Sequence, residues 1–263
     1  MENSMENEHT FVICAYKESI YLKECIDSLK NQEIKSRIIM VTSTENNYIK
    51  RIAKENDIDL FYNKDGGIGK DWNFALNQAS TRYVTIAHQD DIYASDYIKE
   101  ILFNFKKFKN GIIAFSNYKE IRNGKIVDKN TNLKIKELML KPLKIFSKNK
   151  FIRRRSIALG NPICCPSVTY NIDYLKGFFF DEGFDTNLDW DAWERLSRVE
   201  GMFIYVPKDL MFHRIHSESE TSNTINDNRR SEEDLKMLKK FWPKIIAEVI
   251  SKQYSKSEKS NFI

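Results

Sequence analysis

Over its first 115 residues the sequence alternates between two hydrophobic periods. Short apolar runs are typical of buried strands, and between them apolar residues recur at the spacing of one helix face. The expected strands span residues 11–15, 37–41, 59–62, 83–87 and 111–115. The expected helices span residues 19–32, 48–56, 71–79 and 93–108. This alternation predicts an α/β fold with a mostly parallel central sheet flanked by helices.

The second half of the chain is less regular. An Asn123-Gly124 pair is a hairpin signal. Helices are expected over residues 134–159, 189–200 and 229–254, and strands over residues 165–170 and 202–206. The last helix carries an apolar stripe of Leu235, Leu238, Phe241, Trp242, Ile245, Ile246 and Val249. We therefore expect one fused α/β unit, with a boundary between its halves near residue 117, and a C-terminal amphipathic helix over residues 226–263.

The cysteines, the apolar runs and the N-terminal sequence indicate the cellular compartment of the protein. None of the four cysteines has C-x-x-C spacing, so we expect reduced, partly buried thiols. The longest apolar runs are too short to span a bilayer, and the polar first nine residues do not form a secretory signal. We therefore expect a cytoplasmic protein.

The net charge of +5 is unevenly distributed. Residues 134–155 contain nine Lys or Arg and one Glu, whereas residues 173–194 contain seven acidic residues and one Lys. The basic segment has few interleaved aromatic residues and the chain has no nucleic-acid recognition motif, so we expect no nucleic-acid partner. The alternative to a function for these runs is two solvated faces.

Four polar segments follow the expected strands, at residues 15–18, 42–45, 64–71 and 88–91. Because ligands of open α/β sheets bind beyond the carboxyl ends of the strands, these segments predict a binding site. Adjacent carboxylates such as Asp90 and Asp91 repel each other, and a divalent metal would compensate them. The alternative is that Asp90 and Asp91 cap the next helix.

A glycine-rich stretch at residues 66–69 precedes the third expected helix. Glycines let the backbone approach a ligand, and a helix N-terminus favours phosphate. The stretch lacks the Gly-Lys-Ser/Thr ending of a P-loop, and it does not follow the first strand as a Rossmann fingerprint would. A simple glycine-rich turn is the alternative.

Five motifs, in order, resemble family 2 glycosyltransferases of the GT-A fold. They lie at residues 12–32, 67–79, 83–91, 188–193 and 213–216. The similarity runs from about residue 10 to about residue 220 and implies a GT-A-like architecture. It also implies that the protein is an enzyme of bacterial surface polysaccharide or glycan assembly.

The resemblance implies that residues 9–117 bind a nucleotide-diphosphate sugar, most readily a UDP- or dTDP-sugar. The residues expected to contact it are Ala15, Tyr16, Glu18, Ser43, Thr44, Gly67, Gly69, Lys70, Asn73, Gln89 and Asp90. Ser43 and Thr44 replace an Asp with which the family reads the nucleotide base. His88 replaces the first Asp of the Asp-x-Asp motif, so Asp90, Asp91 and His216 are the expected ligands of Mn²⁺ or Mg²⁺.

Residues 118–225 are expected to form the acceptor and catalytic half. The resemblance implies inverting transfer to a hydroxyl of a glycan or lipid-linked acceptor, with Asp189 as the catalytic base. Asp191 is the second candidate, although its spacing also predicts an ion pair with Arg195. Trp190, Asn161 and Cys165 are the expected acceptor contacts.

Two other functions fit an α/β nucleotide-binding sheet. A nucleotidyltransferase would normally carry glycines after the first strand, which residues 15–18 lack. A non-catalytic nucleotide-sugar-binding protein would lack the base or the metal carboxylate. For the basic segment at residues 134–155 we expect either peripheral contact with the inner, anionic face of a membrane or attraction of phosphate-bearing acceptors.

Overall fold

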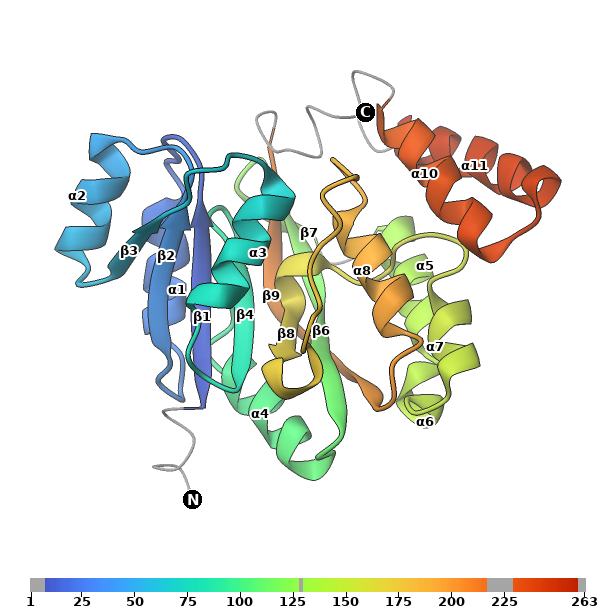
Figure 1. Ribbon diagram of the computed structural model, residues 1–263, viewed down its shortest axis with the longest axis horizontal. Coiled ribbons are helices and arrows are strands. Elements are labelled where there is room, and N and C mark those ends of the chain that lie inside the picture. Colours follow the sequence, from blue (N-terminus) through green and yellow to red (C-terminus); the bar gives the residue numbers. More distant parts are fainter. Residues whose placement is uncertain (1–7, 128–129, 217–228, 260–263) are drawn as a thin grey trace.

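Nine strands form one sheet at the centre of the computed structural model, which describes residues 8–127, 130–216 and 229–259 (Figure 1). The first four strands run parallel in the order β3-β2-β1-β4. They span β1 (His9–Ala15), β2 (Arg37–Thr42), β3 (Asp59–Tyr62) and β4 (Tyr83–His88). These strands lie within two residues of their predicted positions. The parallel part of the sheet therefore follows from the local hydrophobic pattern.

Beyond β4 the sheet is mixed. β8 (Val168–Asn171) lies antiparallel between β4 and β6 (Gly111–Arg122), and β9 (Met202–Ile215) runs parallel to β6. β5 (Ile92–Tyr93) pairs with β9, although a helix was expected to begin there. β9 also continues well past the predicted residue 206, so that its end returns to the carboxyl edge of β4. The hairpin predicted at Asn123-Gly124 is confirmed, since it joins β6 to β7 (Lys125–Val127).

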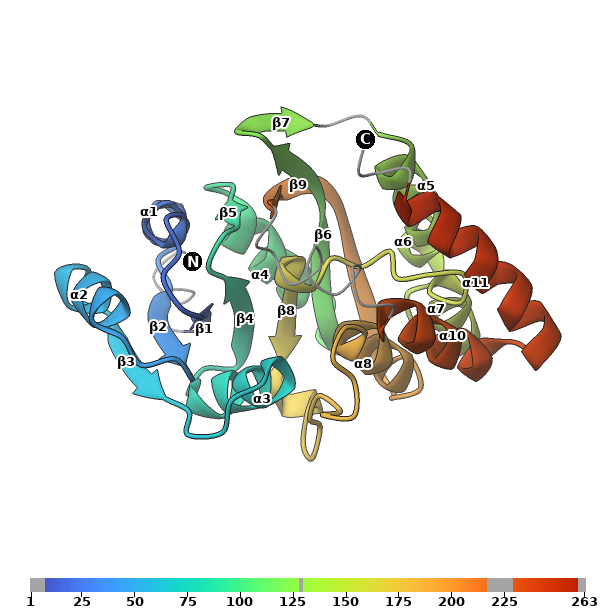
Figure 2. The same ribbon diagram turned by 90° about the horizontal axis from the view of Figure 1, so that it is seen from above.

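Helices cover both faces of the sheet, as Figure 2 shows. One face is packed by α1 (Leu22–Lys30), α2 (Asn47–Glu55) and α4 (Tyr97–Lys107). The other face is packed by α3 (Ile68–Gln78) and α8 (Leu188–Leu196), with aromatic side chains such as Trp72 and Trp193 in its core. The predicted α/β architecture is therefore confirmed.

Two predicted helices are each broken. The one expected over residues 134–159 forms α5 (Thr131–Leu140), α6 (Leu143–Phe146) and α7 (Lys150–Ser156). Pro142 separates the first two, and the side chain of Asn149 caps α7 by accepting from the Ile152 N–H at 3.1 Å.

The C-terminal helix is divided at Pro243 into α10 (Arg229–Phe241) and α11 (Lys244–Lys259), because proline cannot donate the helical hydrogen bond. The single apolar stripe predicted across this helix is therefore wrong. Leu238 and Phe241 reach the core, whereas Ile245 is 77% exposed and Val249 is 59% exposed.

The cysteines Cys14, Cys25, Cys164 and Cys165 are free thiols, as predicted. Within residues 8–127, 130–216 and 229–259, no helix has both the length and the hydropathy needed to cross a bilayer.

Candidate active site

The loop after β1 is tied to the loops after β2 and β4. The Tyr16 N–H donates to Gln89 Oε1 at 3.0 Å, and Gln89 Nε2 donates back to the Tyr16 carbonyl at 2.9 Å. The Lys17 N–H donates to Thr44 Oγ1 at 2.6 Å, and Lys17 has a φ of 52°. The ring of Tyr16 stays 48% exposed, and Glu18 is also exposed. The structure thus brings these predicted residues to one edge of the sheet, with an aromatic ring facing outward.

Asp71 joins the ends of β2 and β3 to the first turn of α3. Its carboxylate accepts from Ser43 Oγ at 2.7 Å and from Asn63 Nδ2 at 2.8 Å, and it is 9% exposed. Asp71 was not predicted as a site residue from the sequence. Its position in the first helical turn, after the polar loop of β3, was the available signal.

The glycine-rich stretch serves two purposes. Gly67 has a φ of 127° and open space around it, and Lys70 is exposed. Gly69 is buried, and a Cβ there would lie 2.6 Å from Leu188 Cδ2. The structure therefore leaves Gly67 and Lys70 facing solvent, whereas Gly69 lets α3 pack closely against the start of α8.

Asn73, on the next turn of α3, binds the loop that precedes α8. Its Nδ2 donates to the Phe180 carbonyl at 3.0 Å, and its Oδ1 accepts from the Phe180 N–H at 2.6 Å. Both polar atoms of Asn73 are thus engaged with Phe180.

The end of β9 meets the loop after β4 in a cluster of acids and bases. His216 Nε2 lies 2.9 Å from Asp90 Oδ2, and His213 Nδ1 lies 2.9 Å from Asp91 Oδ1. Arg214 donates through its backbone N–H to Asp91 Oδ1 and through Nε to the Asp90 carbonyl, both at 2.9 Å. Sequence reasoning placed His213 and Arg214 in the motif at residues 213–216 but selected only His216 from it as a site residue.

The two carboxylates of the cluster differ in exposure. The Asp90 and His216 side chains are 18% and 21% exposed, whereas Asp91 is fully buried. Burial alone would raise the pKa of Asp90, but the hydrogen bond from His216 and the neighbouring His88 and His213 hold that pKa below its ordinary value. Asp90 is therefore an anion at neutral pH.

A cavity of about 320 Å³ lies next to Asp90 and His216. Its lining includes Tyr21, Arg214, His216 and the Asn123-Gly124 turn. The Arg214 guanidinium lies 4.2 Å from the centre of the Tyr21 ring and donates to Glu24 at 2.5 Å. The cavity thus combines a fixed cation, an imidazole and an aromatic ring.

His88 is the last residue of β4. Its ring stacks on Trp72 at 5.5 Å, and its Nε2 is buried without a partner among the described residues. Burial lowers the pKa of His88, against the opposing charges of Asp91, Asp90 and Asp189. The His88 imidazole is therefore neutral, and its Nε2 has no hydrogen-bond partner among the described residues.

Asp189 is the second residue of α8, and its charge acts on His88. Its Oδ2 accepts from Asn161 Nδ2 at 2.6 Å, and its Oδ1 accepts from the Trp190 N–H at 2.7 Å. Burial raises the pKa of Asp189, although these two hydrogen bonds oppose the shift. A carboxylate that is oriented by two donors and has a raised pKa is suited to take a proton. Asn161, expected as an acceptor contact, acts here on Asp189.

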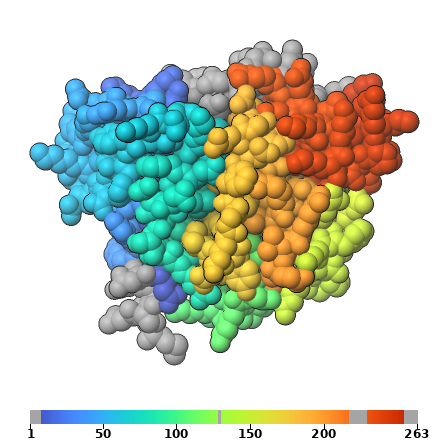
Figure 3. Space-filling model, in the orientation of Figure 1, coloured from blue at the N-terminus to red at the C-terminus, as the bar shows by residue number. Residues whose placement is uncertain are grey.

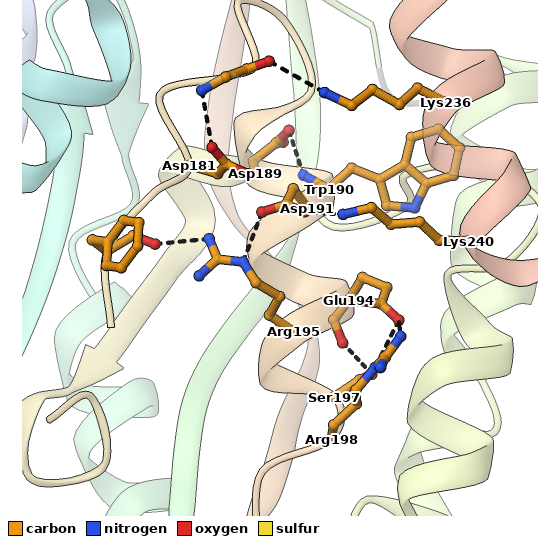
Figure 4. A network of polar contacts seen from close by, with 12 residues as sticks. Asp181, Asp189, Trp190, Asp191, Glu194, Arg195, Ser197, Arg198, Lys236 and Lys240 are labelled. Carbon is orange, nitrogen blue, oxygen red and sulfur yellow. Dashed lines mark hydrogen bonds and ion pairs between the residues drawn. The ribbon is translucent and has the colours of Figure 1, made fainter. Parts of the chain in front are cut away.

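Asp191 has a different role, as Figure 4 shows. It is fully buried, accepts from Arg195 Nε at 2.7 Å and forms a second ion pair with Lys240 of α10. The i,i+4 pair predicted with Arg195 is confirmed. Both carboxylate oxygens of Asp191 are thus engaged by cations, and Lys240 joins α8 to α10 through this pair.

Two expected acceptor contacts lie inside the fold. Trp190 is fully buried, donates through Nε1 to the Ile157 carbonyl at 2.8 Å and stacks on Phe241. Cys165 is 6% exposed, and burial raises the pKa of its thiol. Trp190 therefore anchors α8 to α10 and does not present a surface to an acceptor.

Glu233 of α10, which sequence reasoning missed, holds the loop just before α8. Its carboxylate accepts from the N–H groups of Asp185, Thr186 and Asn187 at 2.7, 2.9 and 3.0 Å. Burial alone would raise the pKa of Glu233, but these hydrogen bonds lower it below its ordinary value. The position of Asp189 thus depends on a helix more than forty residues further along the chain.

A metal ion would find two protein ligands here. No group of three or more His, Cys, Asp or Glu side chains with metal-site geometry occurs in the described part of the chain. Asp90 and His216 nevertheless place one oxygen and one nitrogen 2.9 Å apart at the rim. Mg²⁺ is often held by one or two carboxylates together with substrate phosphates, and Mn²⁺ also accepts imidazole, so the donor set fits either ion.

Sequence comparison connects this geometry with known proteins. The family model described as Glycosyl transferase family 2 matches residues 10–175. An uncharacterized glycosyltransferase of Rickettsia typhi is 24% identical over 226 residues, covering 82% of this chain and 67% of the relative. One of Rickettsia conorii is 24% identical over 261 residues, covering 97% of this chain and 40% of the relative. The minor teichoic acid biosynthesis protein GgaB of Bacillus subtilis is 27% identical over 120 residues, covering 42% of this chain and 13% of the relative.

Solved structures share the fold. TarS residues 1–349 from S. aureus align with a TM-score of 0.63 and 16% identity, over 93% of this chain and 69% of that chain. TarS has also been solved with UDP-GlcNAc. The mannosyltransferase PcManGT from Pyrobaculum calidifontis, in complex with GDP-Man and Mn²⁺, aligns with a TM-score of 0.62 and 16% identity, over 93% of this chain and 69% of that chain.

Proposed function

Because the chain belongs to glycosyl transferase family 2, we propose that it transfers a sugar from a nucleotide-diphosphate sugar to a hydroxyl of a glycan or lipid-linked acceptor. One observation carries the proposal. A carboxylate with a raised pKa, Asp189, and the ionised Asp90, which is bonded to His216, both interact electrostatically with the same imidazole, that of His88. This arrangement separates a proton acceptor from a site for a leaving anion.

The donor lies along the loops after β1, β2 and β4 in this proposal. The exposed ring of Tyr16 packs on the nucleoside, and Ser43 and Thr44 line the place of the base together with Asp71, to which Ser43 is bonded. Gly67, Lys70, Glu18, Ala15 and Gln89 complete the surroundings of the donor. UDP- and dTDP-sugars are the first candidates, and the complex of TarS with UDP-GlcNAc supports a uridine nucleotide.

The diphosphate lies at the rim, next to Arg214 and the pair Asp90 and His216. Asp90 and His216 would hold a divalent ion, with Asp91 behind them fixing His213 and the backbone of Arg214. Bound there, Mn²⁺ or Mg²⁺ would supply positive charge that stabilises the leaving diphosphate. The Arg214 guanidinium, held by Glu24 and by Tyr21, adds a fixed positive charge at the same place.

Asp189 serves as the general base of an inverting displacement in this proposal. It takes the proton of the acceptor hydroxyl while that oxygen forms a bond to the anomeric carbon, and the bond from this carbon to the diphosphate oxygen breaks. Asn161 and the Trp190 N–H orient the carboxylate. His88 offers its unpartnered Nε2 to a hydroxyl of the bound donor.

The test is a panel of UDP-, dTDP- and GDP-sugars incubated with the protein and Mn²⁺. We expect slow release of the nucleoside diphosphate from one donor, and loss of that release when the ion is chelated. Asp90→Asn and His216→Ala should each raise the Mn²⁺ concentration for half-maximal rate about tenfold or more. Direct Mn²⁺ binding, measured by electron paramagnetic resonance, should weaken in parallel.

The matched control is Glu55→Gln, which removes an exposed carboxylate at the C-terminal end of α2, outside the predicted binding segments. It should leave both the rate and Mn²⁺ binding unchanged. Release of pyrophosphate would instead identify a nucleotidyltransferase. Tight donor binding without any release would identify a non-catalytic binding protein, and either result would overturn the proposal.

A further inference from the structure

We propose that the outward side of α5, α6 and α7 is a docking surface for an anionic lipid bilayer. Figure 3 shows this segment, in yellow-green, at one end of the molecule below α10 and α11. The docking surface consists of the exposed apolar side chains Ile135, Leu138, Ile145, Phe146 and Phe151 with the lysines Lys134, Lys141, Lys144 and Lys148. The proposal rests on these side chains and not on the proposed transfer, so either can fail alone.

The apolar part of the docking surface is large for such a short segment. Ile145 is 77% exposed, Phe151 is 65% exposed and Leu138 is 62% exposed. The same helices bury Leu140 and Leu143 against the core, at 3% and 1% exposed. α5 and α6 therefore each bury a leucine against the fold and leave other apolar side chains exposed. On α7, Phe151 is exposed apart from the Arg155 guanidinium over its ring. Clustered exposed apolar side chains are typical of interaction sites.

The cations of this segment fall into two groups. Arg153 donates to the carbonyls of Val199 and Gly201, Arg154 pairs with Glu194, and Lys150 pairs with Glu200. Lys136 also donates to the Tyr118 hydroxyl at 2.8 Å, and the Arg155 guanidinium lies over the rings of Phe151 and Trp242. These five side chains serve the fold.

The lysines at 134, 141, 144 and 148 are all exposed, and none belongs to an ion pair within the described part of the chain. Glu137 is the single acid in residues 134–155. An unneutralised positive field therefore surrounds the exposed apolar side chains.

The charge of the docking surface indicates which kind of partner binds it. Exposed Ile, Leu and Phe between lysines match the interface of an anionic bilayer, where the apolar groups enter the acyl boundary and the ammonium groups meet lipid phosphates. A second copy of this chain would bring the same positive charge to the contact and would be repelled. A nucleic acid would not bury the isoleucines and leucine.

The docking surface lies close to the proposed base. Lys134 and Lys136 of α5 line a small cavity together with Pro162. Pro162 directly follows Asn161, which donates a hydrogen bond to Asp189. A bilayer on this side would therefore bring lipid headgroups next to the loop that orients the base.

The test is co-sedimentation with vesicles of phosphatidylglycerol mixed with phosphatidylcholine, compared with vesicles of phosphatidylcholine alone. We expect binding to the anionic vesicles that falls as salt is raised. Lys141→Gln/Lys144→Gln/Lys148→Gln should weaken it about tenfold or more. Ile145→Ser/Phe146→Ser should weaken it to a similar degree, since both side chains enter the interface.

Matched controls remove the same chemistry elsewhere. Phe103→Ser replaces an aromatic residue on α4 that is 60% exposed, and Lys54→Gln/Lys106→Gln/Lys107→Gln removes three exposed lysines on α2 and α4. Neither control should change vesicle binding. In the absence of vesicles, all variants should release nucleoside diphosphate at the unsubstituted rate.

Three outcomes would overturn the proposal. The first is equal binding to neutral and anionic vesicles, or no binding to either. The second is an equal loss in the docking-surface variants and their controls. The third is a change of oligomeric state in Ile145→Ser/Phe146→Ser, measured by light scattering, with vesicle binding unaltered, because a second copy would then be the occupant.

Discussion

Asp189 and Asp191 lie two residues apart on α8 and have opposite environments. In the described part of the chain Asp189 accepts hydrogen bonds from two neutral donors, Asn161 and the Trp190 N–H. Burial raises its pKa, although these hydrogen bonds and the charge of Arg230 oppose the shift. Asp191 receives two cations, Arg195 and Lys240. Both oxygens of Asp191 are therefore occupied by cations, whereas Asp189, whose pKa is raised, is suited to accept a proton.

Asp189→Asn should therefore lower kcat about 10³-fold while donor binding changes little, because only the proton transfer is lost. In the unsubstituted protein kcat should fall as pH drops through the raised pKa of Asp189, since the base must be deprotonated. The acid limb of the pH profile should thus lie above the range of an ordinary Asp. Steady-state kinetics across pH, with donor affinity from calorimetry, measure both effects.

Asp191→Asn is the matched control on the same helix. It should keep most of kcat and lower the free energy of unfolding by about 1–3 kcal/mol, because the partly exposed Arg195 and Lys240 lose their common partner. If Asp191→Asn abolished transfer and Asp189→Asn did not, the roles of the two residues would be exchanged.

The sequence was enough to predict some contacts around Asp189 and Asp191 but not others. The i,i+4 spacing was enough to predict the pair of Asp191 with Arg195, because it is local. The contact with Lys240 and the burial of Trp190 depend on α10, which packs on α8 from a distant part of the chain. Glu233 was missed for the same reason, since its partners are backbone N–H groups that no side-chain pattern reveals.

At the scale of elements, the start of α8 is positioned by its contact with α3. Gly69 leaves no room for a side chain, because a Cβ there would lie 2.6 Å from Leu188 Cδ2. Leu188 is buried and directly precedes Asp189. The two helices are therefore packed so closely that one methyl group would move the base.

Gly69→Ala should lower the free energy of unfolding by about 1–2 kcal/mol through overpacking. It should also lower kcat about tenfold, because a small displacement of the base disturbs its alignment with the acceptor. Chemical denaturation and single-turnover rates provide the two readouts.

Gly66→Ala is the control, since a Cβ at Gly66 meets no atom within 4 Å. Its free energy of unfolding should stay at the unsubstituted value. Leu188→Ala should lower the free energy of unfolding less in a protein that already carries Gly69→Ala than in the unsubstituted protein, because the shortened side chain removes the clash. An equal loss of unfolding free energy in both proteins would contradict a direct clash between the two side chains.

The elements themselves were predictable to different degrees. Strands β1 to β4 follow from short apolar runs, and Pro142 and Pro243 were visible as helix breakers, although the helices across them were drawn unbroken. The insertion of β8 between β4 and β6 was not predictable, because strand order depends on contacts between distant segments. The long β9 was also missed, since Pro207 and polar residues interrupt its pattern.

For the whole molecule, the C-terminal helices stabilise the catalytic loop through Glu233. Glu233→Gln should lower the free energy of unfolding at neutral pH by about 0.5–1 kcal/mol, a modest value because the side chain is only partly buried. The folded-state pKa of Glu233 is lowered, so its contribution is present above the ordinary Glu pKa and is lost as pH falls through the lowered value. Denaturation at several pH values should show the two proteins converging in acid.

The neighbouring Glu232→Gln is the control, because Glu232 is exposed on the same turn of α10. It should not change the pH dependence. A difference between Glu233→Gln and the unsubstituted protein that persisted at the most acidic pH would assign the effect to packing and not to the charge of Glu233.

The meeting of β9 with the loop after β4 has a consequence for synthesis on the ribosome. Within the described chain β5 pairs with β9, and Asp90 and Asp91 find their bases at residues 213–216. A nascent chain that ends before β8 leaves β4 as an open edge, with two adjacent carboxylates repelling each other. Asp90 and Asp91 are thus translated early, but their hydrogen bonds to His216 and His213 can form only after residue 216 has left the exit tunnel.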